Sequence, residues 1–140
     1  MKILIWSGYQ SSKWNLNTWL KDGIGGSEYC ILQLAIALNK LNHNVTVSGD
    51  VEEGNFDGVQ FIHHEQFLNY QGPVGLSDNS SLRVLTHYDV VIGSNYIHYA
   101  KHLEKDKITF DRSYFWLHNE YFYKWYMGNE MEDWEKYLIS

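Results

Sequence analysis

The sequence predicts an α/β fold in which helices flank a parallel sheet. Residues 3–6 are a continuous apolar run, and Asp-Val-Val-Ile-Gly at 89–93 is a second such run after its opening aspartate; runs of this kind are typical of strands buried on both faces. Residues 27–41 carry apolar side chains at three- and four-residue steps, the spacing of one helix face. With a further strand at residues 45–47, the order strand, helix, strand favours a right-handed α/β layer arrangement.

The clearest predicted helix begins at the glycine pair Gly25-Gly26, with Ser27 as its N-cap. Asn42 or Asn44 is expected to end it, because asparagine tolerates the left-handed conformation of helix C-termini. The apolar stripe that would face the sheet consists of Ile31, Leu34, Ala35, Leu38 and Leu41.

The other segments follow from turn residues and apolar runs. Residues 7–25 lack periodicity and predict a long loop, a kind of segment that is often functional. The remaining expectations are strands at 59–62 and 114–117, turns at 54–58, a loop at 63–79, helices at 82–85 and 94–103, and a partly helical aromatic stretch at 121–140.

Composition bounds the class of protein. With 140 residues, 44% hydrophobic and 20% charged, the chain fits a single folded domain spanning residues 1–140. The net charge of −6 and the lack of a basic stripe argue against nucleic acid as a partner. The lone Cys30 suggests a small buried side chain in a reducing compartment, and without a signal peptide or a membrane-length apolar run we expect a cytoplasmic protein.

Candidate functional residues follow the predicted strands, because ligands of parallel sheets bind at the carboxyl ends of the strands. Free N–H groups at Gly25, Gly26 and Ser27 would suit a diphosphate, although a plain helix cap explains the same glycines. His118 would serve as a hydrogen-bond donor or general acid/base, or else as a structural histidine. The polar residues beside these strand ends are Ser94, Asn95, Asn119 and Glu120.

Two further patterns are weaker. His63, His64 and Glu65 could suggest a metal site, but the sequence identifies no third ligand and solvated loop residues are the simpler interpretation, so no metal is expected. Aromatic residues make up 16% of the chain, and those of the 7–25 loop, Tyr9, Trp14 and Trp19, would suit stacking on a sugar or contact with a partner.

These residues resemble the N-terminal half of GT-B glycosyltransferases, in particular the retaining, nucleotide-sugar-dependent family four. The resemblance rests on the opening strand, on Gly-Gly-Ser-Glu at 25–28 with its Leu-Ala-Ile-Ala-Leu helix and Val-Thr-Val strand, on Asp-Val-Val-Ile-Gly at 89–93, and on Trp-Leu-His-Asn at 116–119. It implies a Rossmann-like domain that helps to move a sugar, with retention, from a nucleotide-sugar donor to a glycan, lipid or protein-linked acceptor.

The resemblance also implies roles for individual residues. The Gly25-Gly26 loop would face the donor diphosphate, His118 would contact the transferred sugar, and the aromatic loop would shape the acceptor site, with no metal or other cofactor. The family's donor-binding C-terminal domain has no counterpart in these 140 residues, so a second domain or partner chain is expected at the aromatic stretch 121–137. The alternatives are a non-catalytic acceptor-binding or docking subunit, and a generic nucleotide- or phosphosugar-binding domain.

Overall fold

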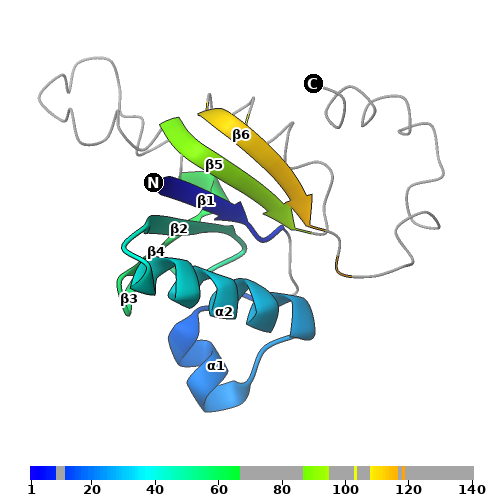
Figure 1. The fold of residues 1–140 in the computed structure, drawn as a ribbon. Coiled ribbons are helices and arrows are strands. Elements are labelled where there is room, and N and C mark those ends of the chain that lie inside the picture. Colours follow the sequence, from blue (N-terminus) through cyan, green and yellow to red (C-terminus); the bar gives the residue numbers. More distant parts are fainter. Residues whose placement is uncertain (9–11, 67–86, 95–102, 104–107, 117, 119–140) are drawn as a thin grey trace, which may run out of the picture.

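A computed structural model describes residues 1–8, 12–66, 87–94, 103, 108–116 and 118. In these ranges the fold is α/β and Rossmann-like, which confirms the predicted fold class (Figure 1). Six strands form one mostly parallel sheet in the order β3-β4-β2-β1-β5-β6. The strands are β1 (Lys2–Trp6), β2 (Asn44–Gly49), β3 (Gly54–Phe56), β4 (Val59–His63), β5 (His87–Ser94) and β6 (Thr109–Trp116).

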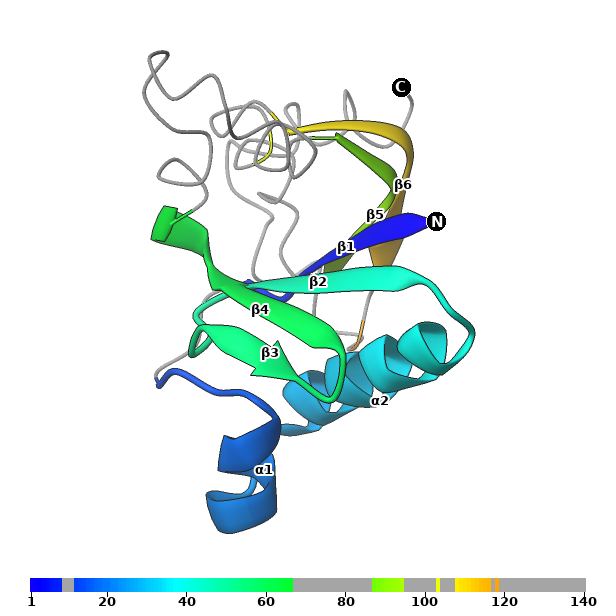
Figure 2. The ribbon, with the colours of Figure 1, turned by 90° about the vertical axis from the view of Figure 1, so that its left-hand side faces the viewer.

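Two apolar clusters cover the two faces of the sheet. Along β1, Ile3 and Ile5 point to one face and Leu4 and Trp6 to the other, and all four are at most 2% exposed. The first face packs against helix α2 (Gly26–Lys40), which crosses the β1, β2 and β4 side of the sheet (Figure 2). Continuous rather than alternating apolar runs are therefore what this sheet requires.

Helix α2 matches the prediction at its end and differs at its start. The backbone oxygen of Gly25 accepts a hydrogen bond from the Tyr29 N–H at 2.9 Å, so Gly25 is the N-cap and Ser27 lies inside the helix. Asn42 has φ 64° and supplies the expected left-handed stop, whereas Asn44 already belongs to β2.

Two expectations about α2 were wrong: that Cys30 is buried and that Leu41 belongs to the apolar stripe. Cys30 is exposed, because it shares the outer side of the helix with Gln33 and Ala37 while Ile31, Leu32 and Ala35 face the sheet. Leu41, which was expected in the apolar stripe, is the C-cap residue and is 68% exposed.

The predicted loop at 7–25 was wrong in part, because it contains helix α1 (Leu16–Asp22). Asn15 caps this helix: its side-chain oxygen accepts the Thr18 N–H at 3.0 Å, while the Asn15 N–H donates to the Thr18 hydroxyl at 3.2 Å. This reciprocal pair is a capping box, with threonine in the place of the usual acidic or amide partner.

Strand β3 is the other element that was missed. Asp57 and Gly58 both have positive φ, at 54° and 83°, as a two-residue type I′ hairpin turn requires. The turn predicted at Asp57-Gly58 is present and pairs β3 antiparallel to β4, whereas Gly54 and Asn55, also expected in a turn, belong to β3. Strand β6 begins at Thr109, five residues before the predicted start of the last strand.

Several expectations fall wholly or largely outside the described residues. These are the helix at 82–85, the helix at 94–103 except for its two ends, the loop at 63–79 beyond residue 66, and the aromatic stretch at 121–140. Of that 94–103 segment, Ser94 ends strand β5 and Leu103 is buried in the second apolar cluster.

Candidate functional site

The sheet has one point where its parallel strand order reverses. From β1 the chain progresses outward through β2 and β4 on one side, and through β5 and β6 on the other. Strands β1 and β5 pair in parallel there, with Trp6 beside Gly93 near their carboxyl ends. In open α/β sheets this reversal opens a crevice that commonly binds ligands.

Two of the predicted site residues meet at this edge. Ser94 is the last residue of β5 and is fully buried. Its hydroxyl lies 2.8 Å from Nε2 of His118, which follows the end of β6 by two residues. The Trp116 ring stacks on the imidazole with centroids 4.3 Å apart and planes 35° from parallel. One ring nitrogen and one ring face of His118 are thus held by neighbours from two strands.

The protonation of His118 is set mainly by its surroundings. Burial lowers the pKa of this imidazole below its usual 6.5, and the negative charge of Glu28 acts in the opposite direction. The neutral form therefore predominates at neutral pH, and a neutral imidazole both accepts and donates a hydrogen bond. The influence of Glu28 also links His118 to the first turn of α2.

No side chain caps the N-terminus of α2 at Gly25, but the Glu28 carboxylate lies close to that residue. A Cβ built on Gly25 would collide with the Glu28 carboxylate, which folds back toward that residue. A Cβ on Gly26 would meet nothing within 4 Å. The glycine pair thus gives close access to the first turn, and the Glu28 carboxylate lies beside the position where an anion would bind.

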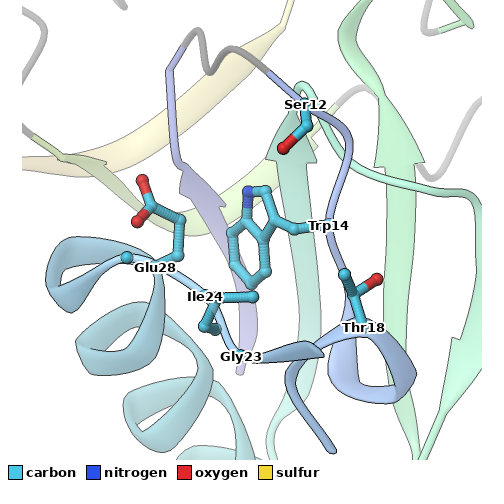
Figure 3. Close-up of a pocket in the computed structure, with 7 residues that line it drawn as sticks. Ser12, Trp14, Thr18, Gly23, Ile24 and Glu28 are labelled. Atoms are coloured by element: carbon cyan, nitrogen blue, oxygen red, sulfur yellow. The ribbon is translucent and has the colours of Figure 1, made fainter. Parts of the chain in front are cut away.

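A pocket of about 220 Å³ adjoins this turn (Figure 3). The Trp14 ring forms part of its wall and lies between Glu28 and Thr18 in this view. The walls combine apolar and polar side chains from the start of α2, from α1 and from the segment before α1. The lining residues are Ser12, Trp14, Thr18, Gly23, Ile24, Gly25 and Glu28.

The two tryptophans assigned to a loop surface are parts of the packed structure. Trp14 is 2% exposed, belongs to the core under α2 and meets Phe61 edge-on at 5.8 Å between centroids. Trp19 lies on α1, is partly buried and packs on Tyr29 at 5.4 Å. Of the other predicted site residues, Tyr9, Asn95, Asn119 and Glu120 lie outside the described residues.

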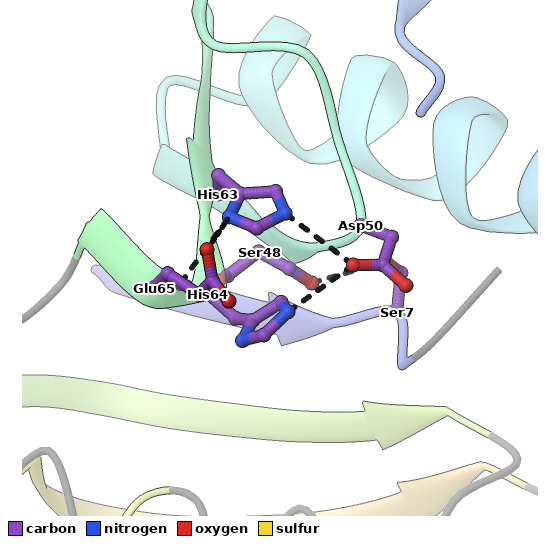
Figure 4. A network of polar contacts seen from close by, with 6 residues as sticks. All are labelled: Ser7, Ser48, Asp50, His63, His64 and Glu65. Carbon is purple, nitrogen blue, oxygen red and sulfur yellow. Dashed lines mark hydrogen bonds and ion pairs between the residues drawn. The ribbon is translucent and has the colours of Figure 1, made fainter. Parts of the chain in front are cut away.

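A second polar group occupies the carboxyl ends of β2 and β4 (Figure 4). Asp50 Oδ1 lies 3.3 Å from His63 Nε2 and 3.1 Å from His64 Nε2, and the two imidazole rings stack with centroids 4.4 Å apart. His63 is only 8% exposed. The interpretation of these histidines as solvated loop residues was therefore wrong.

Sequence reasoning missed Asp50 because it is separated from the histidines along the chain. The parallel register places Gly49 beside His63, which brings the next residue, Asp50, to both imidazoles. Gly49 has φ 144°, and a Cβ there would collide with the Ser7 hydroxyl and approach the Gly8 carbonyl oxygen to 2.6 Å. The ends of β1 and β2 can approach this closely only because residue 49 is glycine.

Comparison with known proteins gave no further assignment: no family model matches the chain, and neither the curated proteins nor the solved structures gave a significant match. Within the described ranges, no helix has the length and apolar character needed to cross a membrane.

Proposed function

We propose that this chain is the acceptor-side, Rossmann-like domain of a retaining glycosyltransferase that uses a nucleotide-sugar donor. The observation that carries the proposal is the Ser94–His118 pair at the sheet's reversal point, with the first turn of α2 near enough for the charge of Glu28 to act on His118. The motif resemblance and the position of the crevice favour the same edge of the sheet. In this proposal the nucleotide is held by a second domain, in the same polypeptide or in a partner chain.

The first turn of α2 would receive the donor diphosphate. The positive dipole end of α2 favours an anion, and Gly26 leaves room for one to approach. The Glu28 carboxylate would have to turn away, because two negative charges so close together repel each other.

His118 would position the sugar. A neutral imidazole fixed by Ser94 and Trp116 can hydrogen-bond a sugar hydroxyl without adding charge to the site. A pocket of 220 Å³ is smaller than the roughly 300–1,000 Å³ of sites that enclose a whole drug-sized ligand. Its size and its mixed walls suit a single sugar ring, and because His118 does not line the pocket, that ring would belong to the acceptor rather than to the transferred sugar.

The test is a ligand-observed NMR titration with a panel of nucleoside-diphosphate sugars. Gly26→Asp should weaken binding at least tenfold, because it adds a negative charge where no atom obstructs the new side chain. Gln33→Glu is the matched control, since it makes the same change in charge on the exposed face of α2. His118→Ala should weaken nucleotide sugars but not free nucleoside diphosphates.

The outcomes separate this proposal from its rivals. Equal losses in Gly26→Asp and Gln33→Glu would mean that net charge alone governs binding, and unchanged affinity in both Gly26→Asp and His118→Ala would refute the site.

A second candidate, a non-catalytic docking subunit, is favoured by β6. Within the described residues this strand lies at the edge of the sheet, and it exposes Phe110 by 41% and Tyr114 by 53%. Edge strands with exposed aromatic side chains are ready surfaces for a partner. Complex formation that Tyr114→Lys abolishes, in a protein that binds no nucleotide sugar, would support this candidate over the first.

A further inference from the structure

We propose that Asp50, His63 and His64 form a binding site for a divalent transition-metal ion of the zinc class. The three side chains offer one carboxylate oxygen and two imidazole nitrogens, a donor set that suits zinc and its neighbours in the first transition series. Their ligand atoms all lie within 4.8 Å of one another.

The distances between these atoms fit a shared ion. With metal–ligand bonds of about 2.0–2.1 Å, two ligands of a tetrahedral ion lie roughly 3.3 Å apart. The two measured separations from Asp50 Oδ1 are 3.3 Å to His63 Nε2 and 3.1 Å to His64 Nε2. The third separation, between the two imidazole nitrogens, is at most 4.8 Å, so an ion would require the two stacked rings to tilt until both nitrogens point at it.

The site is built on fixed backbone. His63 ends β4, His64 begins the short 3₁₀ helix η1 (His64–Gln66), and Asp50 follows β2, which pairs with β4. The side chains are 10%, 14% and 20% exposed for His63, His64 and Asp50. Ligands that are already ordered and mostly desolvated lose little entropy on binding, while the remaining exposure leaves a path for the ion.

Glu65 is placed to act as a hydrogen-bond partner of the His63 ring behind the metal. Histidine ligands usually donate their second ring N–H to a carboxylate or carbonyl group. Glu65 Oε2 lies 3.9 Å from Nδ1 of His63, and a small movement of this 74% exposed side chain would complete that hydrogen bond. Without metal, the Glu65 backbone N–H faces the same Nδ1 at 3.4 Å, so binding would require the imidazole to change tautomer.

Three protein ligands leave at least one coordination position for water or for an anionic group. The site lies at the same carboxyl edge of the sheet as the proposed sugar site, at the ends of β2 and β4 rather than of β5 and β6. Its existence does not depend on the proposed glycosyltransferase function.

Calorimetric titration of Zn²⁺ into the chelator-treated chain tests the proposal, with Co²⁺ absorption spectra reporting the ligand geometry. One equivalent should bind, and both Asp50→Asn and His64→Ala should weaken affinity at least about 100-fold, more than the roughly 10–100-fold typical of losing an outer partner. Glu65→Gln should cost about tenfold. Asp50→Asn keeps the shape of the side chain, so circular dichroism should show an unchanged fold.

His87→Ala is the matched control. His87, Asp89 and Asp111 form another group of potential ligands at the opposite ends of β5 and β6, but His87 and Asp111 are more than half exposed. Loss of binding in the Asp50 and His64 variants with retention in His87→Ala supports the site. Wild-type protein that binds no Zn²⁺, binding that survives Asp50→Asn and His64→Ala, or binding that His87→Ala abolishes would overturn it.

Discussion

Replacing Trp14 with alanine should destabilise the protein far more than it affects any ligand. The ring is 2% exposed, packs edge-on against Phe61 and fills the core between α2 and the sheet. A tryptophan buries about 150–250 Å², and at about 25 cal/mol per Å² this area corresponds to about 4–6 kcal/mol. Because alanine retains part of that burial and the cavity collapses in part, we expect a loss of about 3–5 kcal/mol in the free energy of unfolding.

Urea denaturation followed by circular dichroism measures this loss. Trp19→Ala is the comparison, because Trp19 is only partly buried and should cost about 1–2 kcal/mol. Trp14→Phe should recover much of the stability lost in Trp14→Ala. A loss below about 1 kcal/mol for Trp14→Ala would refute the assignment of this ring to the core and would return it to a surface role in ligand binding.

Four further predictions concern charge and backbone. Glu28→Gln should lower the pKa of His118 further in an NMR titration, because the Glu28 charge opposes the effect of burial. Between the lowered pKa of His118 and about 6.5, the native state binds fewer protons than the unfolded chain. The contribution of His118 to stability is therefore complete above about pH 6.5 and is lost as pH falls through the lowered pKa. His118→Ala should flatten that part of a plot of urea midpoint against pH. Asn42→Val should cost about 1–2 kcal/mol of unfolding free energy in the same urea assay, because φ is 64°, whereas Asn42→Gly should be nearly neutral. Asp89→Ala should cost about 1–2 kcal/mol, because its carboxylate accepts the Lys2 N–H at 2.6 Å and thereby ties β1 to β5; an unchanged urea midpoint would contradict this.

The order of elements was predictable because the strongest local signals were consistent with the global fold. The apolar runs at residues 3–6 and 89–93 belong to strands with neighbours on both sides, so their burial does not depend on fine register. The positive φ at Asn42 and at the Asp57-Gly58 turn was likewise foreseeable, since those residue types tolerate it.

Helix α1 and the core position of Trp14 were missed because their local sequence signals are weak or point to another structure. Helix α1 is only seven residues long and has no buried residue, so it shows little apolar periodicity. Its capping box, formed by Asn15 and Thr18, was the one local indication. Trp14 lies just before this cap, where an aromatic residue in a polar segment suggests a surface rather than the core position it occupies.

The candidate sites depend on contacts that no local pattern encodes. His118 and Ser94 were both expected at strand ends, but the 2.8 Å contact between them depends on the pairing of β5 with β6. Asp50 reaches His63 and His64 only through the register of β2 and β4. A sequence can indicate which side chains carry chemistry, while the register of the sheet decides which of them meet.

The most direct test of the central claim is an NMR titration with a nucleoside-diphosphate sugar that follows two reporters, the backbone amide of Gly26 and the ring protons of His118. If the first turn of α2 and the Ser94–His118 pair form one ligand site, both reporters should shift with the same dissociation constant, and His118→Ala should weaken the response at Gly26. A shift at only one reporter, or two different dissociation constants, would contradict the account.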